Sequence, residues 1–321
     1  MSITYDAILC GSCVLDILVR PVPLDRPVGA DCLVRVEPIR MCPGGFVSNA
    51  GIAMARLGMR VAGLTYVGDD EWGPMLRSKY AAAGVDTRWL TTLPGVNSST
   101  TVVLVDERGQ RSFVHCVGAP KRIDKSLLLD HLDAFAQSRA MLVGYYPLFP
   151  NLLDDLADVL AEIRATGCLT AMDAAGGGGT MDPLHTILPH LDVYVPSLQE
   201  ASQQTGRKDP ADIVQVYRDC GAPGLLGVKL GPRGDLLSPA DGELIEIPPV
   251  DPPGEVVDTT GAGDTFYAAL VTGLLRGLSP EDAGRLAAAA GACCVTAVGG
   301  TDAVRHYDDT ARLAGIGGDP G

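Results

Sequence analysis

The residues with the clearest chemical potential lie in the segment Asp258–Phe266, which reads Asp-Thr-Thr-Gly-Ala-Gly-Asp-Thr-Phe. Apolar residues recur at helical spacing from Phe266 to Leu274, so this turn should open a helix. The unpaired amides of a first helical turn favour an anion, and glycines let a bound group approach the backbone closely. The amides of Gly261, Ala262 and Gly263 are therefore predicted to form an anion hole for a phosphate.

Asp264 lies in the same turn. A carboxylate is repelled by a phosphate, but it can take the proton from a hydroxyl that attacks the phosphorus. The alternative interpretation is that Asp264 only complements the positive end of the helix dipole. The turn is not a Walker A loop, because no Gly-Lys-Ser/Thr follows the glycines.

The composition is typical of a globular protein that acts on small molecules. The 321 residues are 46% hydrophobic, which is enough for one main α/β domain with an appendage. The formal net charge of −14, the absence of a basic run and the 5% aromatic content disfavour a nucleic-acid or anionic-membrane partner. The N-terminal segment has no basic region and no apolar run is long enough to span a bilayer, so we expect a cytoplasmic protein.

The nine cysteines are scattered along the chain. Cys10 and Cys13 form a CxxC pair, for which a redox or zinc site is one interpretation. No second CxxC and no histidine cluster completes a zinc site, and the pair lies at the end of a predicted strand. We predict reduced cysteines that pack as small hydrophobic residues.

Two polar residues interrupt apolar segments near the N-terminus. Asp16 is the one charge in the stretch after a predicted buried strand at Ala7–Cys10, and Asn49 lies in the first turn of a helix predicted at about Val47–Leu57. Both side chains can exchange hydrogen bonds with the hydroxyls of a polyol. The alternatives are a strand-end aspartate and an internal helix cap.

The segment Asp258–Phe266 closely resembles the C-terminal signature of the PfkB-type carbohydrate kinases, the family of ribokinase, fructokinase and adenosine kinase. Pro43–Gly58 resembles the N-terminal signature of the same family, although Phe46 stands where ribokinase has lysine and Val47 replaces the following glycine. The resemblance assigns the binding of substrate hydroxyls to Asp16, Gly44, Gly45 and Asn49.

Two further segments resemble the nucleotide site of the family. Val195–Ala201 is similar to PNxxEA, whose glutamate helps to organise magnesium and phosphates, with Ser197 in place of the asparagine. Val228–Leu237 is similar to the TLGxxG nucleotide-contact loop. The resemblance assigns ATP and Mg²⁺ to Ser197, Glu200, Lys229, Gly231 and Gly234, with Glu200 as the magnesium residue.

A monovalent cation is also implied by the resemblance. In the family, backbone oxygens near the Asp-Thr-Thr segment and near the end of the following helix hold such an ion. The matching residues, Asp258, Thr260, Ala297 and Gly299, are assigned to K⁺. The helix meant is the second one after the Asp-Thr-Thr segment, predicted at Pro280–Val298. It is rich in small residues, which suit either an adenine or close helix–sheet packing.

Strands and helices are predicted to alternate from Ala140 onward. Strands at Met141–Val143, Cys168–Asp173 and Asp192–Val195 are separated by helices, the first at Leu152–Ala165, which indicates a parallel sheet with crossover helices. Ligands bind beyond the carboxyl ends of such strands. Asp173 and the glycines at 176–179 lie at one such end, and we interpret the glycine run as a flexible loop rather than a phosphate cradle.

Four short alternating segments should form a separate small sheet: Val14–Val19, Leu33–Val36 within a strand at Asp31–Pro38, Val102–Val105 and Ser112–Cys116. The resemblance implies a ribokinase-like three-layer α/β sandwich over residues 1–321, with a mainly parallel central sheet and a β-sheet lid contributed by about 14–38 and 97–118. A small isolated sheet cannot bury its own apolar faces, and in ribokinase the lid pairs two subunits, so we expect a homodimer.

These motifs predict an ATP-dependent kinase of a sugar or sugar-like alcohol, with Asp264 as general base. Because Phe46 supplies no cation, we expect a substrate that carries no phosphate of its own. One alternative is a nucleoside kinase in which Phe46 stacks on a base. The other is a sugar- or nucleotide-binding regulator without turnover.

Overall fold

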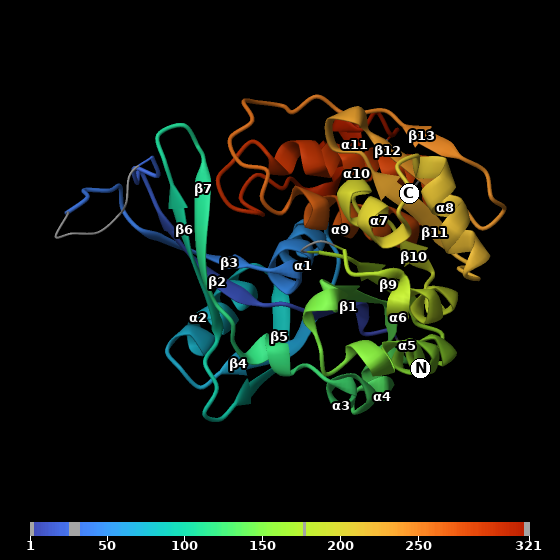
Figure 1. Cartoon of the computed structure of the whole chain (residues 1–321), viewed down its shortest axis with the longest axis horizontal. Coiled ribbons are helices and arrows are strands. Elements are labelled where there is room, and N and C mark those ends of the chain that lie inside the picture. Colours follow the sequence, from blue (N-terminus) through green and yellow to red (C-terminus); the bar gives the residue numbers. More distant parts are fainter. Residues whose placement is uncertain (1–2, 26–32, 176–177, 318–321) are drawn as a thin grey trace.

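The computed structural model describes residues 3–25, 33–175 and 178–317 (Figure 1). Part of the predicted strand Asp31–Pro38 and the glycines at 176 and 177 lie outside the described residues. A nine-stranded sheet forms the centre, in the order β13-β12-β11-β10-β9-β8-β1-β4-β5. Its strands are β1 (Tyr5–Gly11), β4 (Val61–Gly68), β5 (Val85–Leu93), β8 (Ser138–Gly144), β9 (Leu169–Asp173), β10 (Val193–Tyr194), β11 (Leu225–Lys229), β12 (Asp235–Ser238) and β13 (Ile245–Ile247).

The seven strands from β5 to β11 in this order are parallel, and only β12 and β13 at one edge pair antiparallel. Parallel strands are covered on both faces, which explains why β1 is an uninterrupted buried run. The register pairs Gly11 with Gly144, and Gly144 with Asp173. The carboxyl ends of β1, β8 and β9 therefore lie side by side at one edge of the sheet.

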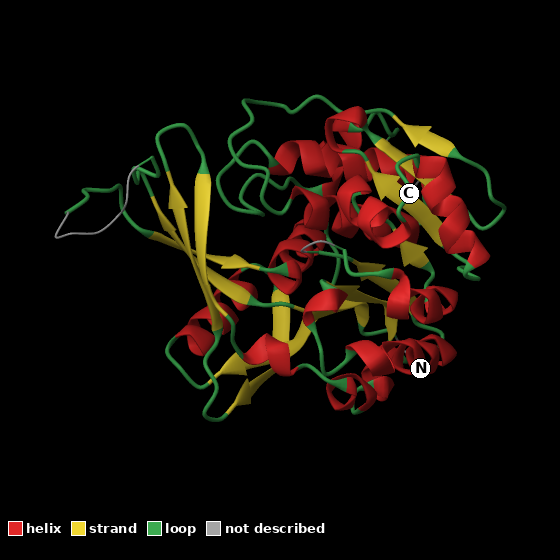
Figure 2. Cartoon of the chain, viewed as in Figure 1, coloured by secondary structure: helices red, strands yellow, loops and turns green. Residues whose placement is uncertain are grey.

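Helices cover both faces of this sheet (Figure 2). Side chains alternate along β1, so that Ala7 and Leu9 join one buried cluster while Ile8 and Cys10 join the other. The first cluster includes α1 (Phe46–Arg56), α2 (Trp72–Ala82), α9 (Ala262–Leu275), α10 (Pro280–Cys294) and α11 (Tyr307–Leu313). The second includes α3 (Lys125–Leu129), α4 (Leu132–Phe135), α5 (Leu156–Ala165), α6 (Met181–Ile187), α7 (Leu198–Thr205) and α8 (Pro210–Asp219). The predicted three-layer arrangement with a mainly parallel sheet is confirmed.

A separate four-stranded sheet stands to one side of the body in Figure 1, and we call it the lid sheet. Its order is β3-β2-β6-β7, with β2 at Val14–Val19, β3 at Arg40–Gly44, β6 at Ser99–Val105 and β7 at Arg111–Cys116. β6 and β7 form the predicted antiparallel hairpin, whereas β2 runs parallel to β6.

The predicted lid strand at Leu33–Val36 is wrong. Residues 33–39 form no strand, and the partner of β2 begins only at Arg40, just beyond the predicted lid boundary at 38. Leu18 pairs with Arg40, so continuing the ladder to Val36 would place it opposite the segment that holds Pro21 and Pro23. Proline has no amide to donate to a ladder, and the pairing ends there despite the alternating sequence.

Two helices differ in extent from their predicted ranges. The alanine-rich helix ends at Cys294 rather than Val298, and a 3₁₀ turn at Leu153–Asp155 precedes α5. The described cysteines are free, and Cys10 and Cys13 are both buried. Within the described part of the chain, no helix combines the length and apolarity needed to cross a membrane.

Candidate active site

The segment Asp258–Phe266 does open a helix, since α9 begins at Ala262. Gly261 precedes it with φ 74°, a left-handed conformation that favours glycine. A Cβ at Gly261 would also lie 2.7 Å from the Cα of Gly300, so no side chain fits there. This turn is packed against the loop after α10, and the first amides of α9 stand where the sequence predicted the anion hole.

Asp264 is buried at this helix start, with an exposed fraction of 4%. Its Oδ2 atom accepts hydrogen bonds from Asn49 Nδ2 at 2.8 Å and from the Tyr145 hydroxyl at 2.7 Å. Burial raises the pKa of Asp264, while these two donors lower it. The carboxylate is thus held through Oδ2 by α1 and by the residue after β8, two elements other than its own helix. This arrangement favours a chemical role over helix capping.

Asn49 reaches Asp264 because of the way α1 begins. Ser12, just after β1, accepts from the amide of Phe46 with its side chain and from the amide of Val47 with its carbonyl. Gly45 precedes the helix with φ 80°, and a Cβ there would lie 2.7 Å from the Ser12 carbonyl oxygen. The helix is therefore fixed against β1, and its first turn directs Asn49 to the aspartate.

Asp16 and Gly44 lie together on adjacent strands of the lid sheet. A Cβ on Gly44 would be 2.0 Å from Asp16 Oδ2, so the carboxylate occupies the space that the missing side chain leaves. Burial raises the pKa of Asp16 to about 6, opposed by a hydrogen bond from Thr101 and assisted by the negative charge of Asp258. The position of Asp16 thus explains on steric grounds why residue 44 is a glycine.

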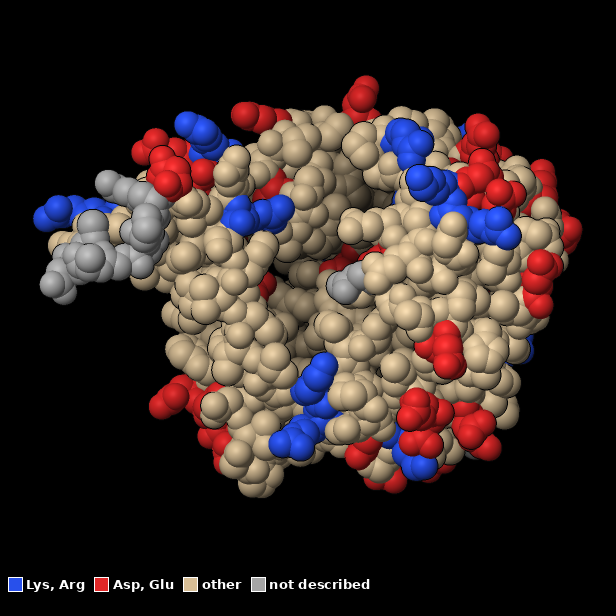
Figure 3. All heavy atoms as spheres, in the orientation of Figure 1, with Lys and Arg blue, Asp and Glu red and all other residues tan. Residues whose placement is uncertain are grey.

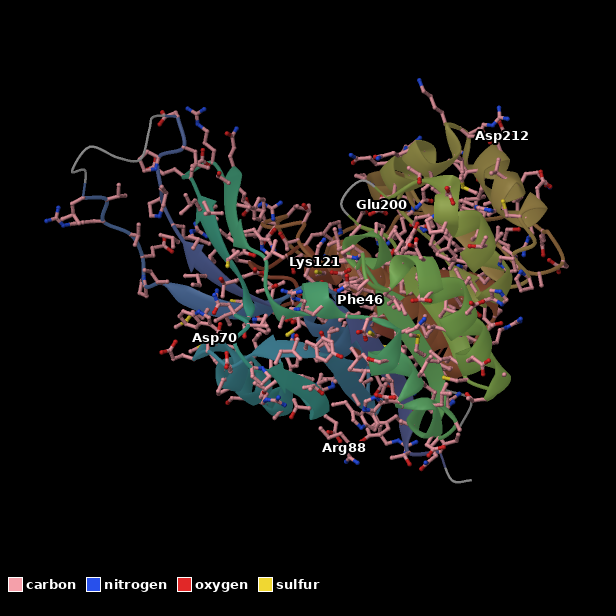
Figure 4. All side chains as sticks on the ribbon, turned by 60° about the horizontal axis from the view of Figure 1, so that its bottom comes forward. Phe46, Asp70, Arg88, Lys121, Glu200 and Asp212 are labelled. Carbon is pink, nitrogen blue, oxygen red and sulfur yellow. The ribbon has the colours of Figure 1, made fainter. Side chains whose placement is uncertain are left out.

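Phe46 is the first residue of α1 and lies in the interior, and its label stands near the middle of the molecule in Figure 4. Its side chain is fully buried, 5.8 Å from the ring of Tyr145 and 6.4 Å from that of Tyr267, measured between ring centroids. The ring lies directly over Gly144, where a Cβ would overlap it. Phe46 is therefore part of the core and is not placed to stack on a substrate.

Lys229 and Asp173 form a buried ion pair at the carboxyl ends of β11 and β9. Lys229 Nζ lies 3.0 Å from Asp173 Oδ1, and the side chains are 10% and 3% exposed. Burial raises the pKa of Asp173 to about 7, with Lys229 opposing the rise and the charges of Glu200 and Asp264 adding to it. A Cβ on Gly263 would lie 3.5 Å from Lys229 Nζ, which places this cation beside the anion-hole turn.

Ser197 and Glu200 form a capping box at the start of α7. The Ser197 amide and hydroxyl donate to Glu200 Oε2 at 2.8 and 2.7 Å, and the Glu200 amide donates to Ser197 Oγ at 3.3 Å. The Ser-x-x-Glu spacing alone could have indicated this structural role. It leaves Oε1 of Glu200 outside the capping box.

Gly231 begins a 3₁₀ turn, η5 (Gly231–Arg233), between β11 and β12, and Gly234 directly follows it. A Cβ on Gly234 would lie 2.0 Å from the carbonyl oxygen of Ile247, so this glycine is required by the neighbouring strand. A Cβ on Gly231 would meet nothing within 4 Å. Of the two predicted nucleotide contacts, Gly231 is the one that faces open space.

Three of the four residues predicted to hold a monovalent cation, Asp258, Thr260 and Gly299, are linked by hydrogen bonds. Asp258 accepts from the amides of Thr260 at 2.9 Å and Gly299 at 3.1 Å, which joins the loop before α9 to the segment after α10. Arg111 of β7 contacts both the Asp258 carboxylate and the Thr260 hydroxyl. Burial alone would raise the pKa of Asp258, but these hydrogen bonds and the charge of Arg111 lower it. Ala297 is two residues before Gly299, and among the hydrogen bonds of the described residues none joins it to this group.

Sequence reasoning missed two residues at the site, Tyr145 and Arg111. Tyr145 directly follows a parallel strand, a position that could have indicated it. Arg111 follows a hairpin turn and carries no such signal. Figure 3 shows the surface hollowed between the lid sheet and the body, with acidic atoms visible inside the hollow.

Comparison with known proteins agrees with this geometry. The model of the pfkB family carbohydrate kinases matches residues 10–306. A fructokinase from Klebsiella pneumoniae is 30% identical over 287 residues, which cover 84% of this chain and 91% of the relative. The solved structure of Arabidopsis thaliana ribokinase complexed with ribose and ATP superposes with a TM-score of 0.82 at 23% identity, covering 98% of this chain and 99% of that one.

A protein from E. coli, solved in complex with ATP and Mg²⁺, superposes with a TM-score of 0.80 at 22% identity, over 98% of this chain and 99% of that one. The fold is thus the ribokinase-like α/β fold. Because the family model covers most of the chain, the protein belongs to the pfkB family of carbohydrate kinases.

Proposed function

We propose that this carbohydrate kinase transfers the γ-phosphoryl group of ATP to a hydroxyl of a sugar or sugar-like alcohol that carries no phosphate, with Asp264 as general base. The observation that supports the proposal most directly is the buried Asp264 carboxylate at the start of α9, held through Oδ2 by two donors from other elements. One oxygen is thereby fixed, and Oδ1 stays available for a hydroxyl proton.

In the proposed reaction, the substrate oxygen forms a bond to the γ-phosphorus while the bond from that phosphorus to the β,γ-bridging oxygen breaks. The hydroxyl proton passes to Asp264 Oδ1. The amides of Gly261, Ala262 and Gly263, with Lys229 beside them, stabilise the charge on the transferred group. Positioning and electrostatics supply most of the rate enhancement.

Mg²⁺, when bound with the nucleotide, neutralises charge on the phosphates. The donor set fits such an ion, because the negative charge of Glu200 raises the pKa of both Asp173 and Asp264, and an added cation would relieve repulsion that Lys229 only partly offsets. Among the described residues no three acidic, histidine or cysteine side chains form a metal cluster of their own. That suits Mg²⁺, which usually keeps waters and takes one or two carboxylates together with substrate phosphates. Glu200 is our candidate ligand.

The substrate hydroxyls are assigned to Asp16, with Gly44 making room for its carboxylate. Phe46 supplies no cation, but it is buried in the core, so it cannot decide whether the substrate carries a phosphate. The cations near the site are more informative. Lys229 already serves the transferred phosphoryl group and Asp173, and Arg111 is paired with Asp258, so neither cation is left to neutralise a phosphate carried by the substrate.

The nucleoside-kinase alternative loses its aromatic platform, because Phe46 packs inside the core. The K⁺ site remains a proposal, with Asp258, Thr260, Ala297 and Gly299 as its residues. Arg111 already contacts two of them, so a cation would share that position with the guanidinium.

The test is ATP consumption by wild type and Asp264→Asn over free sugars, sugar phosphates, sugar acids and nucleosides. At least one free sugar or sugar acid should be turned over by the wild type, faster than its phosphate ester. Asp264→Asn should lower kcat by about 10²-fold or more, with ATP binding nearly unchanged. A variant kcat within a few-fold of wild type would remove Asp264 from the mechanism, and ligand binding without turnover would support a regulator.

A further inference from the structure

Tyr145 has an unusual backbone conformation for its residue type. Its φ is 64°, and among the described residues it is the only one other than glycine with a positive φ. Left-handed backbone is unfavourable for a bulky side chain and persists only when the surroundings impose it. Such residues cluster at functional sites, and the Tyr145 hydroxyl donates to Asp264 Oδ2 at 2.7 Å.

The surroundings hold Tyr145 firmly. Its amide donates to the Asp173 carbonyl at 3.0 Å, so the carboxyl end of β9 anchors its backbone. Its carbonyl accepts from the Leu148 amide at 2.9 Å, which closes the next turn. The edge of its ring meets Phe46, which in turn lies over Gly144. The strained backbone and the packed ring together direct the hydroxyl to the aspartate.

We propose that Tyr145 is a positioning residue for the reaction, which holds the Asp264 carboxylate so that Oδ1 faces the substrate hydroxyl. The inference rests on the proposed function of Asp264 as general base. Asn49 of α1 donates to the same oxygen at 2.8 Å. Two donors on one oxygen fix both the rotation of the carboxylate and the choice of the oxygen that receives the proton.

Tyr145 acts as a donor throughout the working pH range. Burial and the neighbouring Asp264 charge raise the pKa of Tyr145 well above its usual value, so its proton stays on the phenol. The proton that moves in the reaction is that of the substrate, which passes to Oδ1. The tyrosine proton remains in its hydrogen bond to Oδ2.

The titration of Asp264 depends on groups from every element around it. Its pKa is lowered by Asn49 of α1, Tyr145 after β8 and Lys229 of β11. The negative charges of Glu200 of α7 and Asp173 of β9 oppose its ionisation. The buried thiol of Cys294 of α10 also interacts electrostatically with it. Removing the Tyr145 hydroxyl deletes one of the lowering groups. The pKa of Asp264 then rises, so the base is protonated up to a higher pH.

The test compares Tyr145→Phe with Tyr146→Phe. Tyr146 is the matched control, because it is adjacent, buried and donates to the Gly178 carbonyl at 3.1 Å rather than to Asp264. Tyr145→Phe should lower kcat by about 10-fold or more, the worth of a hydrogen bond to a charged group. It should also move the acidic limb of the kcat profile to higher pH and leave the KM for ATP nearly unchanged. Tyr146→Phe should lower the melting temperature and leave the pH profile in place.

The inference would be overturned if Tyr145→Phe left both kcat and the acidic limb of the kcat–pH profile unchanged. It would also be overturned if Tyr145→Phe and Tyr146→Phe shifted that limb equally. Melting temperatures of both variants separate a loss of fold from a loss of alignment. In an Asp264→Asn background, adding Tyr145→Phe should cause no further loss of kcat; a full additional loss would assign Tyr145 a role apart from Asp264. If Asp264→Asn itself remains active, the proposed function fails, whatever Tyr145→Phe shows.

Discussion

Replacing Gly44 with alanine tests the proposed substrate site by a steric change alone. The backbone of Gly44 has no positive φ, so alanine fits its conformation, but the new Cβ would lie 2.0 Å from Asp16 Oδ2. Real Cβ contacts are essentially never closer than 3.0 Å, so the carboxylate must move by about 1 Å or more. The backbone of Asp16 cannot follow, because β2 is paired with β3 on one side and β6 on the other.

A shift of this size removes a hydrogen bond between Asp16 and a sugar hydroxyl. Such a bond to a charged group contributes about 1.5–3 kcal/mol, which corresponds to about a 10- to 150-fold change in kcat/KM for the sugar. We therefore expect Gly44→Ala to lower kcat/KM for the sugar by about 10²-fold. The KM for ATP should stay the same, because Asp16 lies on the lid sheet and the predicted nucleotide residues follow β10 and β11.

Steady-state kinetics with varied sugar and varied ATP measure both effects. Gly51→Ala is the control, since its Cβ would meet its nearest neighbour at 3.7 Å, an ordinary contact, and alanine favours a helix interior. In an Asp16→Ala background the clash disappears, so Gly44→Ala should add nothing. A normal kcat/KM in Gly44→Ala, or an additive loss in the double variant, would refute the assignment of Asp16 and Gly44 as one unit.

Two further predictions concern stability and assembly. Burial raises the pKa of Asp235 to about 7, whereas the unfolded chain releases this proton near the normal pKa of 3.8. Between pH 3.8 and about pH 7 the folded protein therefore binds more protons than the unfolded chain, and the free energy of unfolding falls as pH rises. The melting temperature of Asp235→Asn minus that of wild type should therefore be more positive at about pH 8 than at about pH 5, and a pH-independent difference would contradict this. Phe113 and Val114 are 57% and 61% exposed on the edge strand β7, so we expect a second copy of the chain to cover them. Sedimentation should give a homodimer that Phe113→Glu dissociates, whereas a monomeric wild type at micromolar concentration would count against it.

The sequence predicted the elements whose signals are local. Apolar runs such as Ala7–Cys10 and Cys168–Asp173 mark buried parallel strands, and glycine turns mark the starts of α1 and α9. The prediction of a lid strand at Leu33–Val36 was wrong because a strand also needs a partner strand. The prolines after β2 prevent that segment from serving as the partner. Alternation of side chains alone does not contain that information.

The candidate site was predictable as a set of residues but not as a set of contacts. The motifs indicated Asp264, Asn49 and Asp16. The hydrogen bond from Asn49 to Asp264, however, joins residues that are 215 positions apart in the sequence. Helix α1 is apolar on nearly all sides, so the sequence could not indicate that Phe46 points into the core. The pairing of Arg111 with Asp258 likewise depends on where the lid sheet stands relative to the body.

The position of α1 has a consequence for biosynthesis. Residues 46–54 of this helix are all buried, and their cover includes Phe266, Leu270 and other apolar residues of α9, which belong to the last fifth of the chain. A ribosome makes α1 and the strands beneath it long before α9, so the apolar side of α1 that α9 covers stays exposed through most of the synthesis of the chain. Such surfaces aggregate or recruit chaperones, and the chain cannot complete its candidate active site until its final segments emerge.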